Sequence, residues 1–287
     1  MATGVTEHID ATTADAFIAE IWSKKAQVAR EENLVLAELF NTDYREEMAY
    51  GDTLHVPGIS NLTVQTKNRS ANAAVLYETV TEVNTDITVS TWEYSAVAIE
   101  TATARQVSQD LLDRYAPKQS YALAESLDAA LAARGDDFSQ AVGTLTVENT
   151  YDEWLRAVQY LDDANAPQTG RFALISPAAK AGVMKLDAFV NADYSKLNAD
   201  FSPARKESLL GSWMGIPFYF STNVEGTNAA GHDNILAQRE AVALVAQMRP
   251  TTHTMFDIDY LARKVVVEQL YGLAEMRDDH GVWVRGA

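Results

Sequence analysis

Apolar residues recur at spacings of three, four and seven between Ala14 and Phe40, a pattern typical of an amphipathic helix. Lysine, arginine and glutamate side chains lie between the apolar positions. A charged segment of this kind, ahead of the first strand signal, predicts an arm that packs against something else. A helix folded onto the core of its own chain explains the same pattern, and the residues do not decide between the two.

The pattern then changes from helical to β. Gly51 to Pro57 (GDTLHVP) is a short alternating segment bounded by glycine and proline, and it predicts a strand. From Ser60 to Thr85 the chain is polar, with scattered valines and many β-prone residues. It has too few apolar residues to bury both faces, and too much β-propensity for a flexible linker. We expect an extended two-stranded excursion that projects from the domain.

A strand over Asp86 to Ile99 leads directly into helix. Apolar residues at helical spacing run to Tyr115. Pro117 then interrupts this helix, and a second helix starts at the same proline. Gly135, directly after Arg134, is a plausible stop for that helix. The two pieces make a helical span of about 35 residues, which is long beside an average helix.

The second half of the chain is predicted to contain both helices and strands. Thr150 and Glu153 have the spacing of a capping box, and Ser176 followed by Pro177 indicates another helix start. Asp257 to Glu275 carries the strongest β-signal, and a turn at Asp278 to Gly281 predicts that this long strand folds back into a short one at Val282 to Val284. Shorter strands are expected at 171–175, 216–221, 235–238 and 241–247.

Composition excludes several classes of protein. The chain has 287 residues, of which 47% are hydrophobic, and 40 acidic residues against 23 basic ones, a net charge of −17. This excess opposes tight binding to nucleic-acid phosphates. The chain has no cysteine, so disulfides and thiolate sites are excluded. The longest apolar run, 241–246, is too short to cross a bilayer, and the polar N-terminus is unlike a secretory signal, so we expect a cytosolic chain without a membrane partner.

Catalytic and metal-binding patterns are missing. The five histidines are widely separated and give no metal site. Gly226 to Gly231 has the glycine spacing of a phosphate loop, but His232 and Asp233 stand where Lys and Ser or Thr are needed. No nucleophile elbow occurs. We therefore assign no catalytic, cofactor-binding or metal-binding residue, and we expect no enzyme and no cofactor.

An ordered set of motifs resembles the tailed-bacteriophage major capsid proteins with the Hong Kong 97-type fold. In many of these proteins an F-x-x-E-x-W-S helix precedes a G-D-T strand that ends in proline. The match runs in order through nearly the whole chain: Phe17–Ser23 (FIAEIWS), Gly51–Pro57, the long helix ending at Arg134, Arg171–Pro177 (RFALISP), Gly215–Pro217 and Val265–Gly272 (VVVEQLYG).

The resemblance implies an α+β fold with an N-terminal arm, an extended β-hairpin called the E-loop, a peripheral domain with a long spine helix and long strands, and an axial α/β domain. The implied limits are 1–50 for the arm, 51–85 for the first strand and the E-loop, 86–145 for the peripheral domain with its spine helix, 146–250 for the axial domain, and 251–287 for the C-terminal strands, which return to the peripheral domain.

The function implied is that of a major capsid protein, which assembles into pentamers and hexamers of an icosahedral virion shell around double-stranded DNA, in the host cytoplasm. The implied partners are other copies of the chain, a portal, a decoration protein in some relatives, and a separate scaffolding protein, because only about fifty residues precede Gly51. Candidate subunit-interface residues are Trp22, Phe40, Lys67 and Arg69.

Two points keep alternatives open. Some relatives cross-link a loop lysine to an asparagine, but nothing identifies a partner for Lys67, and a solvated or ion-pairing role is favoured. An encapsulin-like cellular nanocompartment shell shares the fold, and an acidic cytosolic enzyme is a third alternative.

Overall fold

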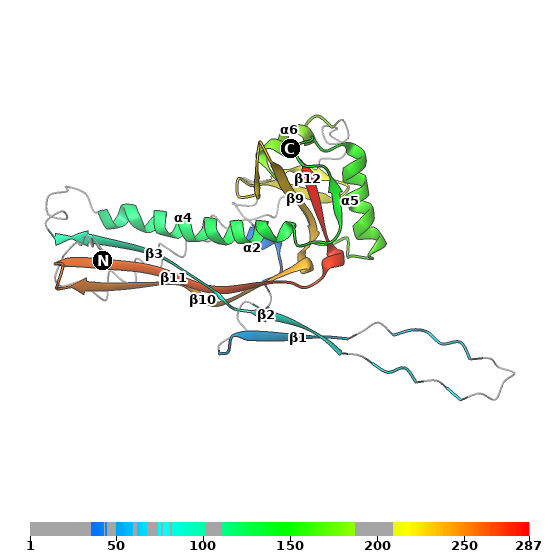
Figure 1. Cartoon of the computed structure of the whole chain (residues 1–287), viewed down its shortest axis with the longest axis horizontal. Helices are drawn as coiled ribbons and strands as arrows, with labels where there is room; N and C mark the ends of the chain where they lie inside the picture. The colour runs from blue at the N-terminus through cyan, green and yellow to red at the C-terminus, as the bar shows by residue number, and fades with distance from the viewer. Residues whose placement is uncertain are drawn as a thin grey trace.

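A computed structural model of the chain confirms the predicted α+β class. Two sheets, one of three strands and one of seven, lie at the two ends of the main body, and a two-stranded sheet projects from it (Figure 1). The structure describes residues 36–42, 44, 50–59, 62–67, 74–75, 77–80, 82–101, 111–186 and 209–286.

The three-stranded sheet is antiparallel and carries a long helix along one face. Its order is β10 (Val242–Asp257), β11 (Ala262–Glu275) and β3 (Thr91–Glu100). Helix α4 (Leu111–Ala132) runs along this sheet and continues into the 3-10 turn η1 (Ala133–Gly135) (Figure 1). The consecutive valines of β11 explain its strong strand signal, and half of the side chains in this strand are buried.

Helix α4 is continuous through Pro117, so the predicted break at this residue is wrong. A proline inside a helix removes one backbone hydrogen bond and costs about 3 kcal/mol. Leu127 and Leu131 of the same helix are fully buried, and their packing offsets this cost. The predicted helical residues 102–110 are outside the described part of the chain.

A polar network joins α4 to the sheet. The Glu93 carboxylate of β3 accepts hydrogen bonds from Ser126 Oγ of α4 (2.7 Å), from Gln269 Nε2 (2.8 Å) and from the Tyr271 hydroxyl (3.1 Å). Gln269 Nε2 also donates to the Leu123 carbonyl of α4. Hydrogen bonds need defined geometry, so this network fixes the position of the helix on the sheet.

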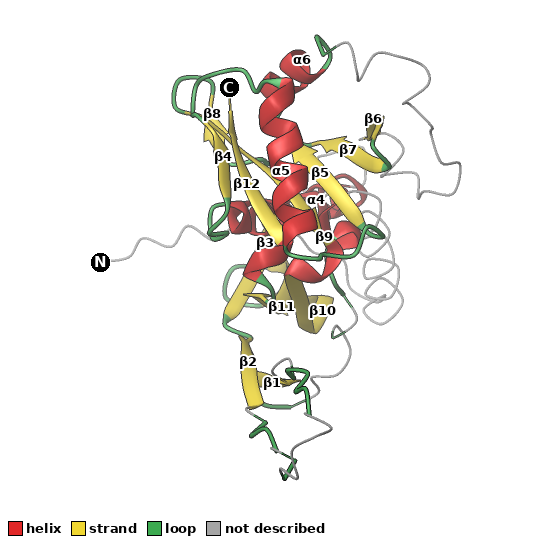
Figure 2. Cartoon of the chain, turned by 90° about the vertical axis from the view of Figure 1, so that its right-hand side faces the viewer, coloured by secondary structure: helices red, strands yellow, loops and turns green. Residues whose placement is uncertain are grey.

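The seven-stranded sheet has the order β4-β12-β9-β5-β7-β6, and β8 pairs with β9. Helix α5 (Tyr151–Asp163) crosses one face of this sheet (Figure 2), and α6 (Pro177–Val183) follows β5. The predicted caps are confirmed, since Thr150 and Glu153 form a capping box and Ser176 caps α6. The strands are β4 (Ala141–Gly143), β5 (Arg171–Ile175), β6 (Leu209–Trp213), β7 (Ile216–Phe220), β8 (Gly226–Thr227), β9 (Gly231–Gln238) and β12 (Gly281–Gly286).

The last strand does not fold back onto the long strand before it, so that prediction is wrong. The 3-10 turn η3 (Asp278–His280) carries the chain across to the other sheet, where β12 pairs antiparallel with β9 and parallel with β4. Val282 and Val284 of β12 are fully buried in the core under α5. That burial, which a two-stranded fold-back would not provide, explains the placement.

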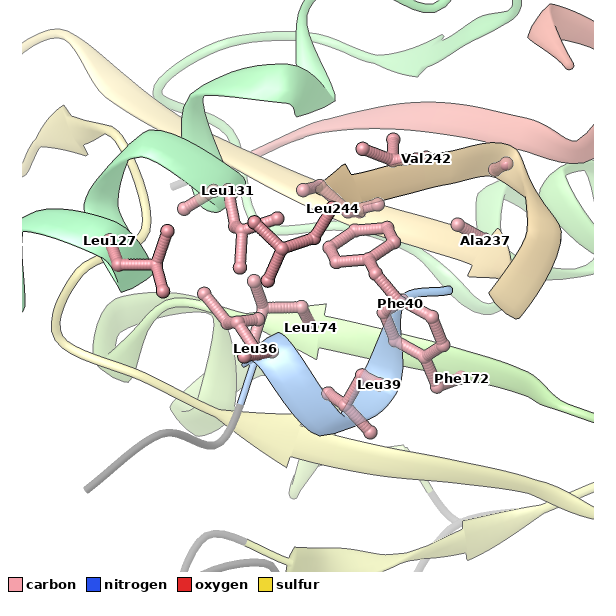
Figure 3. Close-up of a cluster of buried hydrophobic side chains, with 14 of the residues drawn as sticks. Leu36, Leu39, Phe40, Leu127, Leu131, Phe172, Leu174, Ala237, Val242 and Leu244 are labelled. Carbon is pink, nitrogen blue, oxygen red and sulfur yellow. The ribbon is translucent and has the colours of Figure 1, made fainter. Parts of the chain in front are cut away.

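A hydrophobic cluster joins the two sheets. Short helix α2 (Leu36–Leu39) and Phe40 pack against Leu127 and Leu131 of α4, against Phe172 and Leu174 of β5, and against Val242 and Leu244 of β10 (Figure 3). Asn41 continues this contact, since its backbone bonds Val242 and Leu244 of β10. The described end of the predicted arm helix is thus folded onto the core of its own chain.

Strands β1 (Thr53–Ile59) and β2 (Glu82–Thr88) form the projecting antiparallel sheet, which confirms the strand predicted at 51–57. The single strand expected over 86–99 is divided, because β2 pairs with β1 whereas β3 pairs with β11. The division lies where Thr88 passes over Gly272, at which an added Cβ would come 2.4 Å from the Thr88 carbonyl oxygen. Residues 62–67 and 77–80 continue beyond β1 and β2, away from the body (Figure 1).

Candidate subunit-contact surfaces

The extension beyond β1 and β2 exposes apolar side chains to an unusual degree. Val64 is 97% exposed and Tyr77 is 93% exposed. Leu62, Val75 and Val80 are also exposed. Apolar side chains gathered on a segment that its own chain does not cover are typical of a contact surface for another molecule.

One cross-connection ties the two legs of this extension. Glu78 accepts hydrogen bonds from the Thr63 backbone nitrogen (2.8 Å) and from the Thr63 hydroxyl (2.9 Å). The candidate Lys67 is exposed on the first leg, four residues beyond this connection. These hydrogen bonds fix the distance between the two legs at Thr63 and Glu78, close to the position of Lys67 on the first leg.

A second candidate surface is the face of the three-stranded sheet that points away from α4. Neighbouring residues of a strand point to opposite faces, so Trp92 and Tyr94 lie opposite Glu93, which bonds to the helix. Both aromatic side chains are exposed. Trp92 Nε1 donates to Glu268 (2.9 Å), and the other oxygen of this carboxylate lies 2.9 Å from His253 Nε2. The face therefore combines exposed aromatic rings with a fixed polar cluster.

The turn between β10 and β11 is a third apolar surface. Ile258, Tyr260 and Leu261 are exposed at this tip, and Leu261 has a φ of 51°. Lys264 forms an ion pair with Asp257 at the base of the turn, and their hydrogen bond lowers the pKa of the Asp257 carboxyl. A non-glycine residue in the left-handed region costs conformational energy, so the tip has a defined shape that this ion pair supports.

The four residues predicted for the interface have different positions. Lys67 is exposed, as a contact residue must be in a free subunit. Phe40 is fully buried in its own chain, with its ring centroid 5.0 Å from that of Phe172. Phe40 therefore packs the core between the two sheets and has no exposed surface to offer a neighbour. Trp22 and Arg69 are outside the described residues.

Sequence reasoning did not select Trp92, Tyr94 or the tip residues as contact residues. One signal was available: Trp92 and Tyr94 alternate with the polar residues Glu93 and Ser95, so any sheet here has an aromatic face. The alternation does not tell which face the helix covers. The Glu93 side chain bonds α4 and the aromatic side chains are left exposed, which only the packed structure decides.

The described residues contain no group of three or more His, Asp or Glu side chains that could hold a metal ion. Within the same part of the chain, no helix has the length and hydropathy needed to span a membrane.

No family model matches the chain, and no curated protein matches it. Solved structures do match. A chain of the structure titled "Mycobacterium phage Che8" has a TM-score of 0.72 at 20% sequence identity, covering 88% of this chain and 90% of that one. A chain from the capsid structure of the cyanophage P-SCSP1u has a TM-score of 0.68 at 15% identity, over 87% and 86% of the two chains.

A third similar structure is that of a virus-like particle from Pyrococcus furiosus. Its chain has a TM-score of 0.61 at 10% identity, and the match covers 94% of this chain and 100% of that one. The likeness in all three cases extends over nearly the full length of both chains. The chain therefore has the fold of phage capsid proteins, as its resemblance to the tailed-bacteriophage major capsid proteins predicted.

Proposed function

We propose that this chain is a major capsid protein, a virion component that assembles in the host cytoplasm into pentamers and hexamers of an icosahedral shell around double-stranded DNA. The proposal is supported by the shared fold and by the surfaces described above. Its action is assembly, without a chemical step.

The observation that carries the proposal is the exposure of Val64 and Tyr77 on the projecting extension. Burying apolar surface contributes about 25 cal/mol per Å². The extension leaves the body of its own chain, so another molecule is needed to cover it (Figure 1). Copies of the same chain, each with the same extension and the same exposed sheet face, supply such a cover by symmetry.

The contacts of a shell are individually weak. A solvent-accessible ion pair, such as Lys67 or Arg69 with an acidic neighbour, contributes below about 1 kcal/mol. A subunit that makes several such contacts with several neighbours gains affinity through multivalency, without any single strong contact. This favours a closed assembly of many copies over a dimer.

The parts of the chain take the following roles in this proposal. Residues 1–50 are an N-terminal arm, 51–85 include the E-loop that lies across a neighbouring subunit, 86–145 form the peripheral domain and 146–250 form the axial domain that meets its copies at the symmetry axes. The strands after residue 251 return to the peripheral domain in this proposal. Three strands depart from these limits: β4 and β12 lie in the seven-stranded sheet, and β10 of the three-stranded sheet already begins at Val242. A scaffolding protein and a portal are the proposed partners, with a decoration protein in addition.

The net charge of −17 supports a shell that encloses DNA without sequence-specific binding. An acidic inner wall does not neutralise phosphates, so DNA is not held to it by ion pairs. Packaged DNA then stays free to enter and leave.

Negative-stain electron microscopy of the expressed chain, with and without a co-expressed scaffolding protein, tests the proposal. We expect closed particles of uniform diameter with the scaffolding protein present. A monomer on sizing chromatography under both conditions, at concentrations where the chain stays folded, contradicts the proposal.

The likeness to the Pyrococcus furiosus virus-like particle favours a second candidate, an encapsulin-like nanocompartment shell. The contents of particles purified from the native source separate the two functions. A virion contains double-stranded DNA that resists nuclease until the shell is opened, whereas a nanocompartment contains protein cargo.

A further inference from the structure

Strands β1 and β2 together with the extension form one ribbon, and its two sides differ. The β1–β2 register pairs Ile59 with Glu82. Four residues further along each leg, Thr63 and Glu78 are joined by two hydrogen bonds, so the extension keeps the register of the strands. Successive side chains of a strand point to opposite sides, and therefore each residue of the extension can be assigned to one side of the ribbon.

The first side of the ribbon is polar, and its side chains bond to one another. In β1 and β2 this side carries His55, whose Nδ1 atom lies 2.5 Å from the Asp86 Oδ1 atom. In the extension it carries Thr63 with Glu78, and also Gln65, whose Nε2 atom donates to the Thr63 hydroxyl at 3.2 Å. These hydrogen bonds are made within the ribbon, so the polar side does not depend on another molecule for them.

The second side of the ribbon is apolar and is covered only at its base. There Leu54 and Val56 of β1 and the fully buried Ile87 of β2 pack against Val245 of β10 and Leu270 of β11. The base of the ribbon thus already lies on the three-stranded sheet of its own chain.

The same side continues uncovered along the extension. The exposed apolar residues that the register assigns to it are Leu62, Val64, Val75 and Tyr77. Beyond its base the ribbon leads away from the body, so the chain that carries these side chains does not cover them (Figure 1).

The face of the sheet that receives the base of the ribbon has the same division. Leu270 packs against the base, and its register partner on β3 is Trp92. Paired residues of neighbouring strands share a face, so Trp92 and then Tyr94 continue the face of Leu270 along β3. Trp92 is 68% exposed and Tyr94 is 70% exposed. The contact made by the base therefore ends where an exposed aromatic region of the same face begins.

Trp92 can be covered by apolar side chains without losing a hydrogen bond. A buried indole N–H needs an acceptor, and Trp92 Nε1 already donates to one oxygen of Glu268 at 2.9 Å. The other oxygen of this carboxylate lies 2.9 Å from His253 Nε2. The cluster fixes the position of the indole ring before any partner arrives, which lowers the entropy lost on binding.

We propose that the apolar side of one copy's extension packs on the sheet face around Trp92 and Tyr94 of a second copy. The inference rests on the proposed assembly of many copies, and it names the surface that receives the extension. The occupant is the same chain because the contact continues an existing one: the base of the ribbon packs on this face in its own chain, and the outer part packs on the next region of the face in a neighbour. The two surfaces differ, so the contact is head-to-tail, and such contacts form a ring when they close.

The contact is tested with a bimane label, which loses fluorescence when it touches a tryptophan ring. The chain has no cysteine, so Val64→Cys places a single label on the apolar side of the extension. The labelled copies also carry Trp92→Phe, which keeps an aromatic ring on the sheet face but removes the quencher. They are mixed with unlabelled copies that retain Trp92, so that the label and Trp92 belong to different copies.

We expect the bimane fluorescence to fall as unlabelled copies are added and then to reach a plateau. Unlabelled Trp92→Phe copies, which keep every other tryptophan, should not lower it. A label at Gln65→Cys, on the polar side of the ribbon, is the matched control and should stay bright with either kind of copy. An equal response to copies with and without Trp92 overturns the proposal, as does an equal response at positions 64 and 65.

Electron microscopy of the same mixtures separates this inference from the proposed function. Particles that form without the Trp92-dependent loss of fluorescence overturn the contact and leave the shell proposal standing. A Trp92-dependent loss without particles supports the contact and contradicts the closed shell. The absence of both overturns both.

Discussion

Gly135 and Ile235 are in direct contact: a Cβ atom added at Gly135 would lie 2.5 Å from the Ile235 Cγ1 atom and 2.8 Å from its Cδ1 atom. Gly135 does not have the left-handed φ that a helix-ending glycine usually has. The glycine predicted as a helix stop is therefore needed for a different reason. It lets the end of the spine helix press onto β9 at the junction of the two sheets.

Gly135→Ala is expected to destabilise the subunit by about 1–3 kcal/mol, because the extra methyl group overpacks this contact. Urea unfolding of the purified chain measures the loss. Gly182→Ala in α6 is the matched control, since its added Cβ meets the nearest atom at 3.7 Å. In the background of Ile235→Ala, which removes both contacting atoms, Gly135→Ala should cost much less. An unchanged cost in that background contradicts the contact.

Phe40→Ala is expected to destabilise the unassembled subunit by about 3–5 kcal/mol, because it leaves a cavity between α2 and Phe172. Thermal unfolding of the single chain is the measurement. Tyr50→Ala removes an aromatic side chain that is 94% exposed, and it should leave the stability unchanged. A Phe40→Ala subunit that is stable but fails to assemble would contradict the core role and support the original prediction that Phe40 is a subunit-interface residue.

Thr150→Ala is expected to cost about 1 kcal/mol, because the substitution removes the hydroxyl that caps the first turn of α5. The midpoint of urea unfolding should fall without a change in slope. Thr144→Ala, at an exposed position of the preceding loop, serves as the control. Equal midpoints for the two variants would show that the cap contributes nothing measurable.

The double variant Lys67→Glu with Arg69→Glu is expected to fold normally and to assemble poorly, because two positive charges of the proposed E-loop segment 51–85 become negative in a chain whose net charge is already −17. Particle yield in electron microscopy and circular dichroism of the subunit are the two measurements. Lys67→Arg with Arg69→Lys keeps the charges and should assemble as the unsubstituted chain does. An unchanged yield of the charge-reversed variant would remove these residues from the interface.

Local patterns were sufficient for the elements whose signals lie within a few residues. The capping box of Thr150 and Glu153, the start of α6 at Ser176 and the strand at Arg171–Ile175 all agree with the structure. In each case the physical cause is local, either a side chain that bonds a nearby backbone nitrogen or a run of apolar residues in one strand. The order of the motifs also indicated the overall fold.

The errors arose where distant segments compete for the same residue. Val282 and Val284 have the pattern of a strand, but whether β12 pairs with β11 or with β9 depends on which sheet buries these side chains. Pro117 disfavours a helix locally, and the packing of α4 on the sheet overrides it. Strand pairing and helix packing are non-local, so a residue pattern can propose them without choosing between them.

The candidate contact residues show the same division. The sequence by itself determined the α+β class, the strand and helix starts with local caps, the excess of negative charge and the polar, β-prone composition of the projecting excursion. Only the tertiary structure decided that Phe40 is buried and that Trp92 and Tyr94 are exposed. Burial is a property of the packed chain, since it arises when segments far apart in sequence exclude water from one another.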